Sequence, residues 1–277
     1  MELVYLGIYL LVLIAAAVCG WSASKMSSRR FGLCLFGAAA VICLRALLYA
    51  RPEYEQHLLF LWNDYVYFAE WSGPAAMLVV FAMAGRLEGV RVRRAVGAVL
   101  ILIAPVFFWE TAAVCLRPSY GMPARFDENE VCLQSTSHSC GPAAAVTLLH
   151  SMGKSVSEGE MANLTLLRPG QGVTALELTR GLNVALRSAG WRARIDRLNE
   201  QELAWQRRPF MAELRRPGGR FHCVVVRKVH SDSVVVADPA YGEKVVDMAG
   251  FLSEWTGITI TAVPSAGRRA TLARVLH

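Results

Sequence analysis

The chain has 277 residues, of which 54% are hydrophobic, and a formal net charge of +7. The length allows two domains of ordinary size. Apolar runs dominate the first 115 residues, whereas the rest has the mixed composition of a soluble domain. The basic residues lie in loops and in a C-terminal segment rather than in a stripe interleaved with aromatic residues. This distribution argues against a nucleic-acid-binding protein.

Four apolar stretches approach or exceed the roughly 20 residues that cross a bilayer as a helix. They are 3–22, 31–50, 65–85 and 95–115. The first has neither a basic leading segment nor a clear small-residue cleavage site, so we expect it to be retained rather than removed as a signal peptide. The third is the weakest, because polar residues interrupt its start. Residues 1–115 are therefore predicted to form a four-helix transmembrane region.

The loops between these spans carry unequal charge. The basic residues of the first and third loops are Lys25, Arg29, Arg30, Arg86, Arg91, Arg93 and Arg94. The positive-inside rule places both loops in the cytoplasm. We therefore expect a multi-pass integral cell-membrane protein whose C-terminal domain is extracytoplasmic; without the third span, the orientation would invert.

Charged residues occur inside the predicted spans, at Arg45, Glu70 and Glu110. Such residues are costly in a membrane unless they are paired or lie near its surface. We interpret them mainly as a structural arginine–carboxylate pair. The alternative is a polar recess that receives a membrane-associated substrate.

Residues 116–130 are rich in proline and glycine and are predicted to form a linker. They lead into a domain over 131–263 and a basic tail over 264–277. The seven cysteines include no paired spacing typical of metal ligands, so no metal is expected. A disulfide between Cys115 and Cys132 remains open if this half faces an oxidising compartment.

The stretch from Gln134 to Ala145 places a thiol at the start of a helix. Pro142 suits a first helical turn, and Gly153 ends the run of helix formers that follows. Cys140 then lies where unpaired backbone N–H groups favour a thiolate. Gln134 can reach back beside the backbone N–H of Cys140, and these two donors would form an oxyanion hole.

The remaining elements run from helices to strands. Helices are expected at 155–167, where Ser157 and Glu160 allow a capping box, at 174–189 and at 199–206; strands are expected at 191–195, 210–214, 224–226 and 234–236. Helices followed by an antiparallel sheet predict an α+β domain.

Two further residues complete a candidate catalytic site. His222 opens the first strand of the predicted hairpin, and Asp238 closes the second. Asp238 could accept from one imidazole nitrogen while the other faces Cys140. One residue of strand register decides whether both side chains share a face. His138 is too close to the helix start to serve easily as the base, and Cys223 should point to the opposite face of its strand.

These residues resemble a known family. Gln134, Cys140-Gly141-Pro142-Ala143, His222 before a valine run, and Asp238-Pro239-Ala240 with Gly242 are similar to the C39 family of papain-like, bacteriocin-leader-processing cysteine peptidases. The resemblance covers roughly 130–262. It implies a papain-like peptidase fold and cleavage of peptides, with double-glycine-type leaders as one candidate class. Many members are fused to ATP-driven peptide exporters.

The chain departs from that fused arrangement. Gly153-Lys154-Ser155 matches only the end of a nucleotide-binding P-loop, because Leu148 stands where its first glycine is needed. We therefore expect no nucleotide and an exporter, if any, that is a separate protein. The domain also lies after the membrane spans and, by the charge rule, outside the cell membrane.

The sequence thus predicts an α-helical membrane region followed by an α+β papain-like cysteine peptidase domain. Its site would comprise Cys140, His222, Asp238 and Gln134, without metal or organic cofactor. The expected partners are a peptide or protein substrate and the lipid bilayer, with no nucleic acid. Two alternatives stay open: a peptide-binding or regulatory module that does not cleave, and a cysteine-dependent amidase or acyltransferase acting on an envelope substrate.

Overall fold

The computed structural model describes residues 2–68 and 70–265. The chain divides into two compact units, one formed by residues 1–58 with 62–116 and the other by 59–61 with 117–277. The predicted basic tail lies outside the described residues from 266 onward.

The N-terminal part is helical. Its elements are α1 (Glu2–Ala23), α2 (Ser28–Ala50), α3 (Pro52–Leu61), the 3-10 helix η1 (Asn63–Phe68), α4 (Ser72–Gly85) and α5 (Val90–Cys115). Among the described residues, three stretches are long and apolar enough to cross a membrane: Glu2–Ala23, Ser28–Ala50 and Asn63–Gly85. The fourth predicted span falls within α5, where the side chains of 100–104, 106 and 107 lie outside the description.

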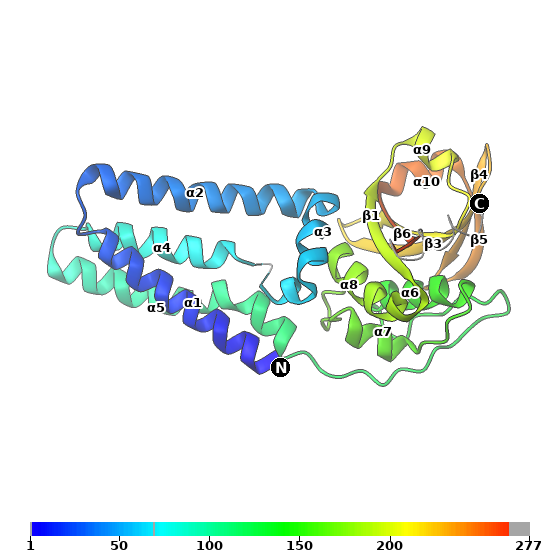
Figure 1. Ribbon diagram of the computed structural model, residues 1–277, viewed down its shortest axis with the longest axis horizontal. Coiled ribbons are helices and arrows are strands. Elements are labelled where there is room, and N and C mark those ends of the chain that lie inside the picture. Colours follow the sequence, from blue (N-terminus) through cyan, green and yellow to red (C-terminus); the bar gives the residue numbers. More distant parts are fainter. Residues whose placement is uncertain (1, 69, 266–277) are drawn as a thin grey trace, which may run out of the picture. The chain divides into compact units, whose positions relative to one another are not determined.

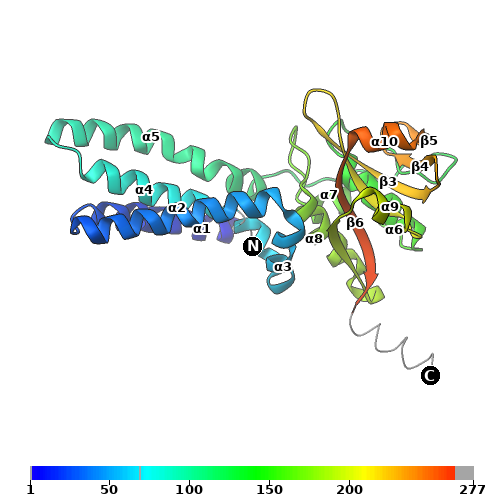
Figure 2. The ribbon, with the colours of Figure 1, turned by 90° about the horizontal axis from the view of Figure 1, so that it is seen from above.

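The long helices α1, α2, α4 and α5 run alongside one another, with α4 in contact with the other three (Figure 2). Gly20 permits the close approach of α1 to α4, because a Cβ there would collide with the carbonyl oxygen of Leu78. Arg45 is only 7% exposed, and its Nη2 donates to Glu70 Oε1 at 2.8 Å, with Glu55 Oε1 3.5 Å from Nη1. The predicted arginine–carboxylate pair is therefore present within this unit.

The second unit combines short helices with one antiparallel sheet. Its helical elements are α6 (Cys140–Ser151), α7 (Glu158–Leu164), α8 (Ala175–Leu186), η2 (Arg187–Ala189), α9 (Glu200–Ala204) and α10 (Met248–Glu254). The strands are β1 (Trp191–Arg197), β2 (Phe210–Arg215), β3 (Phe221–Val229), β4 (Ser233–Asp238), β5 (Gly242–Asp247) and β6 (Trp255–Pro264). The strand order is β1-β6-β2-β3-β4-β5.

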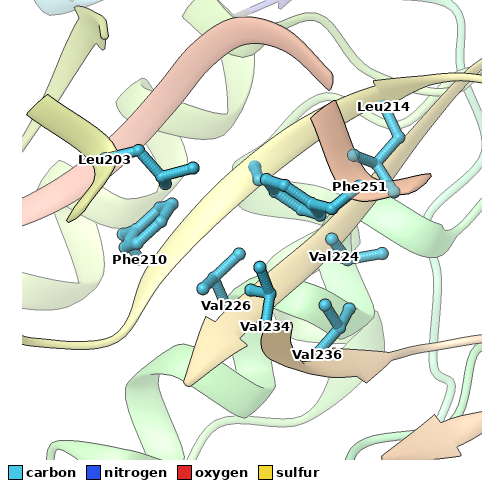
Figure 3. Close-up of a cluster of buried hydrophobic side chains, with 9 residues drawn as sticks. Leu203, Phe210, Leu214, Val224, Val226, Val234, Val236 and Phe251 are labelled. Atoms are coloured by element: carbon cyan, nitrogen blue, oxygen red, sulfur yellow. The ribbon is translucent and has the colours of Figure 1, made fainter. Parts of the chain in front are cut away.

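Helices cover both faces of this sheet (Figure 1). On one face, Leu203 of α9 and Phe251 of α10 pack on inward-facing residues of β2, β3 and β4, and Figure 3 shows this core. On the other face, α6 packs against β3 and α8 against β1. Alternation along the valine-rich strands supplies apolar side chains to both layers. The sheet therefore holds α6, and with it Cys140, against the strand that carries His222.

The predicted order of helices followed by an antiparallel sheet is confirmed. The hairpin of β3 and β4 and the capping of α7 by Ser157 are also found; Ser157 accepts from the backbone N–H of Glu160. Strands β5 and β6 were not predicted from the sequence. Cys132 is buried within the second unit, and its bridge to Cys115 stays a prediction.

Candidate active site

Cys140 is the first residue of α6, and the buried helix fixes its position. Every residue of α6 from Gly141 to Leu149 is buried. Glycine is required at 141 for packing, because a Cβ there would lie 2.6 Å from Val173 Cγ2 and 3.2 Å from a methyl group of Leu178. The N-terminus of α6 therefore lies directly against the segment that leads into α8, and Cys140 remains partly accessible at its tip.

The Cys140 thiol is surrounded by hydrogen-bond donors. It interacts with the His222 side chain and with the backbone N–H groups of Cys223 and Gly141. Burial opposes ionisation of the thiol, but these donors outweigh burial and hold the pKa of Cys140 below its ordinary value. The thiolate is thus stabilised by one imidazole and two backbone groups.

His222 and Asp238 share one face of the hairpin. Val225 of β3 pairs with Ala237 of β4, and continuing this register sets position 224 opposite Asp238. His222 precedes position 224 by two residues and so points to the same side. Its Nε2 lies 2.7 Å from Asp238 Oδ1, which leaves Nδ1 for the interaction with Cys140. The register that the sequence left open is the one that brings the two residues together.

The protonation of His222 follows from these neighbours. Burial alone would lower the pKa of the imidazole, but the hydrogen bonds to Asp238 and Cys140 raise it to about 9. The imidazolium form is therefore favoured near neutral pH. A lowered pKa for Cys140 beside a raised pKa for His222 describes a thiolate–imidazolium pair.

Asp238 has more partners than the sequence suggested. The residue is fully buried, and its Oδ1 also accepts from the backbone N–H of Ala240 at 3.0 Å. Its Oδ2 accepts from Lys244 Nζ at 2.8 Å and from Arg216 Nη2 at 3.3 Å. Burial favours the neutral acid, yet His222, Lys244 and Ala240 together lower the pKa of Asp238 below its usual range. The carboxylate stays charged beneath the imidazole.

Arg216 and Lys244 were missed because their proximity to Asp238 is set by tertiary structure. Arg216 follows β2, and its guanidinium also pairs with Glu254 of α10 at 2.8 Å. Lys244 lies on β5, the strand that returns beside Asp238. The one local signal in the sequence was Lys244 itself, a cation six residues after Asp238 and across a tight turn from it.

Gln134 lies beside the turn that follows Asp238. Its backbone N–H donates to the Pro239 carbonyl at 2.9 Å, and its side-chain Nε2 donates to the Thr136 carbonyl at 2.8 Å. An amide nitrogen carries two N–H groups, so one remains for another acceptor. The Oε1 atom is buried, and among the described residues no donor to it is recorded.

Other nearby candidates are set apart by their surroundings. His222, rather than His138, is the histidine that interacts with Cys140. The Cys223 thiol is held neutral, because burial raises its pKa well above the ordinary value. Within residues 2–68 and 70–265, no group of three or more His, Cys, Asp or Glu side chains has the arrangement of a metal site. The chemistry available here is that of an ionised thiol with an adjacent proton donor.

Comparison with known proteins gives matches to the second unit. The sequence model described as the peptidase C39 family matches residues 128–267. A protein of Methanothermobacter thermautotrophicus is 32% identical over 136 residues, which are 49% of this chain and 89% of the relative. The "Probable functional amyloid protease FapD" of Pseudomonas fluorescens is 31% identical over 140 residues, 47% of this chain and 58% of that protein.

Among solved structures, the peptidase domain of Streptococcus ComA, a bifunctional ABC transporter, is 22% identical with a TM-score of 0.44. That match covers 48% of this chain and 96% of the domain. The family match spans half of the 277 residues and includes every residue of the candidate site. The chain therefore belongs to the peptidase C39 family.

Proposed function

We propose that this chain is a membrane-anchored cysteine peptidase whose catalytic residues are Cys140, His222, Asp238 and Gln134. The observation that carries the proposal is the continuous set of contacts from the Cys140 thiol through His222 to the buried Asp238. Structural thiols are held neutral by burial, as Cys223 is. Cys140 is the reverse case, because its pKa is lowered.

In the first step, the Cys140 thiolate attacks the carbonyl carbon of a peptide bond. The carbonyl electron pair moves to oxygen, and the resulting oxyanion accepts from the Cys140 backbone N–H and from the free N–H of Gln134 Nε2. The His222 imidazolium then donates its proton to the leaving amine as the C–N bond breaks. The products are the released amine and an acyl-enzyme.

In the second step, neutral His222 removes a proton from water, which attacks the thioester. The tetrahedral intermediate collapses, the C–S bond breaks, and Cys140 leaves as a thiolate while the carboxylic acid is released. Asp238 holds the imidazole in the orientation that both steps need and stabilises its charged form. No step requires a metal or an organic cofactor.

The substrate class follows from family membership. Peptides are the proposed substrates, with double-glycine-type leaders as the first to test. The three membrane-length stretches would tether the site to the bilayer. With α5 as the fourth predicted span, the loop charges favour an extracytoplasmic peptidase unit. A separate exporter would then deliver the peptide.

The test follows alkylation of Cys140 in the full chain in detergent, by iodoacetamide and peptide mass mapping between pH 5 and 10. We expect the thiolate to form well below the free-cysteine pKa of about 8.5 and this low pKa to be lost in His222→Ala. His138→Ala is the matched control, because it removes a nearby histidine without touching the pair. The same preparations are then incubated with peptides that carry a double-glycine leader.

Cleavage by the wild type and by His138→Ala, but not by Cys140→Ala or His222→Ala, would support the proposal. An ordinary Cys140 pKa that His222→Ala leaves unchanged would overturn the catalytic role of the pair.

A further inference from the structure

Glu158 is a fully buried carboxylate outside the set of residues proposed above. It is the first residue of α7, directly after Ser157, and has 0% exposure. Its Oε1 accepts from the backbone N–H of Ser135 at 2.9 Å, and its Oε2 accepts from the hydroxyl of the same residue. Both carboxylate oxygens are therefore directed at one residue of the segment that precedes Cys140.

Ser135 belongs to a short loop, residues 134–139, whose backbone is fixed at each end. Gln134 is held by the Pro239 carbonyl at the start of the loop. At the other end, Ser139 Oγ accepts from the Thr136 backbone N–H at 3.0 Å, and Ser139 is itself fully buried. Between these points, Glu158 is the group that holds Ser135. The side chain of Gln134 depends on the same loop, because its Nε2 donates to the Thr136 carbonyl.

Holding a loop with a buried carboxylate is energetically unfavourable, because the charge is removed from water. Such a removal is strongly unfavourable unless hydrogen bonds compensate. Arg125 Nη2 lies 3.4 Å from Ser135 Oγ and brings a positive charge to this pair through the hydroxyl. Charge-assisted hydrogen bonds are shorter and more directional than neutral ones. Such bonds would hold loop 134–139 firmly in one position. This matters because a small displacement of the Gln134 amide donor would change the reaction rate.

We propose that Glu158 is a positioning residue that holds loop 134–139 so that the Gln134 amide is aimed at the oxyanion. The inference rests on the proposed function, since it assigns Glu158 to the same site. Glu158 touches neither the substrate nor the reacting atoms; it acts through Ser135 on Gln134. Its removal is therefore expected to impair reactions that build charge on oxygen and to spare reactions that need the thiolate alone.

The experiment compares two probes on the full chain in detergent. The first is a peptide aldehyde ending in Gly-Gly-al: the thiolate adds to the aldehyde carbon, and the carbonyl electron pair moves to oxygen, which gives a hemithioacetal oxyanion while His222 keeps its proton. The second is iodoacetamide, from which the thiolate displaces iodide without forming an oxyanion. The variants are Glu158→Gln, Ser135→Ala, Gln134→Ala and the double variant Glu158→Gln with Gln134→Ala. Glu160→Gln is the matched control, because it removes an exposed carboxylate from the same helix.

We expect Glu158→Gln to weaken binding of the aldehyde by roughly 10- to 100-fold, the range that displacement of a catalytic group by about 1 Å can cost. The pH profile of iodoacetamide alkylation should stay that of the wild type, which also shows that the variant is folded. Gln134→Ala should cost much less in the Glu158→Gln background than in the wild type, because the donor is already misplaced. Ser135→Ala should give a smaller loss in the same direction, and Glu160→Gln none.

The outcomes separate this inference from its premise. A wild-type chain that forms no adduct with the aldehyde and has an ordinary Cys140 thiol overturns both the proposed function and the role of Glu158. A wild-type adduct that Gln134→Ala weakens and Glu158→Gln leaves unchanged overturns the role of Glu158 alone. Additive losses in the double variant would also overturn it, since Glu158 would then act independently of Gln134.

Discussion

Lys244 Nζ lies 2.8 Å from Oδ2 of Asp238, the carboxylate oxygen that does not contact His222. The charge of Asp238 is thus divided between the imidazole on one side and Lys244 and Arg216 on the other. This division limits how strongly the carboxylate can stabilise a protonated His222. The two cations are therefore expected to lower the pKa of His222 as well as to hold Asp238 in place.

Lys244→Met should raise the pKa of His222 above its present value of about 9, because a nearby positive charge is removed. The alkaline limb of the pH–rate profile should move to higher pH in the variant. The measurement is peptide cleavage by the full chain as a function of pH. Lys228→Met, which removes an exposed lysine from β3, is the control. An alkaline limb that does not move would show that Lys244 exerts no electrostatic effect on the imidazole.

Asp238→Asn should have the opposite effect on the imidazole. The wild-type reaction requires protonated His222, so its rate should fall as the pH rises through about 9. An amide cannot stabilise the imidazolium as a carboxylate does, so the pKa of His222 should fall and the limb should move to lower pH. Cleavage near neutral pH should drop on the order of 10⁴-fold, as in the serine-protease triad when its aspartate becomes asparagine. A rate within the wild-type range would contradict the orienting role of Asp238.

The same shift has a consequence for stability. The folded-state pKa of His222, about 9, lies above its ordinary value of 6.5. Its protonated form therefore stabilises the fold fully below pH 6.5, and this contribution is lost as the pH rises through about 9. We expect the free energies of unfolding of the wild type and of Asp238→Asn to approach each other at alkaline pH. Chemical denaturation of both proteins at several pH values measures this.

Local chemistry made part of this arrangement predictable. The valine runs at 224–226 and 234–236 indicated a hairpin, and a hairpin returns to its starting edge, which brought His222 and Asp238 near each other. Cys140 followed from the residues that start a helix. The order of the strands in the sheet was not predictable from the sequence. Strand β6 inserts between β1 and β2, and pairing between strands far apart in sequence leaves little trace in either strand alone.

The residues that support the site were harder to predict for the same reason. Glu158, Arg216 and Lys244 come from three separate parts of the chain, and each reaches the site only after the sheet and helices have packed. In the sequence, Glu158 fits the ordinary pattern of an acidic residue in a first helical turn. Burial, rather than residue type, is what distinguishes it from Glu160.

Gly242 begins β5 directly after the turn that follows Asp238, with φ of +85°. A Cβ at this position would lie 2.6 Å from Asp127 Oδ2, and Asp127 Oδ1 accepts from the backbone N–H groups of Asn129 and Val131. Gly242→Ala should therefore lower the free energy of unfolding by about 1–3 kcal/mol, from backbone strain and from displacement of Asp127. Gly121→Ala is the control, because its added methyl meets nothing within 4 Å. Chemical denaturation of both variants in detergent tests this, and equal midpoints would contradict it.

The charge distribution of the N-terminal loops makes a prediction about sidedness. The segment from the end of α4 through the first turns of α5 contains Arg86, Arg91, Arg93 and Arg94, against a single acidic residue, Glu88. The positive-inside rule places this segment in the cytoplasm, so a chain that crosses the membrane again along α5 carries its peptidase unit outside. Alkaline phosphatase fused after residue 265 should be active, because it folds only in an oxidising compartment, whereas a fusion after Glu88 should be inactive. Replacing the four arginines with glutamine should weaken this preference. The reverse pattern of activity would place the peptidase unit in the cytoplasm.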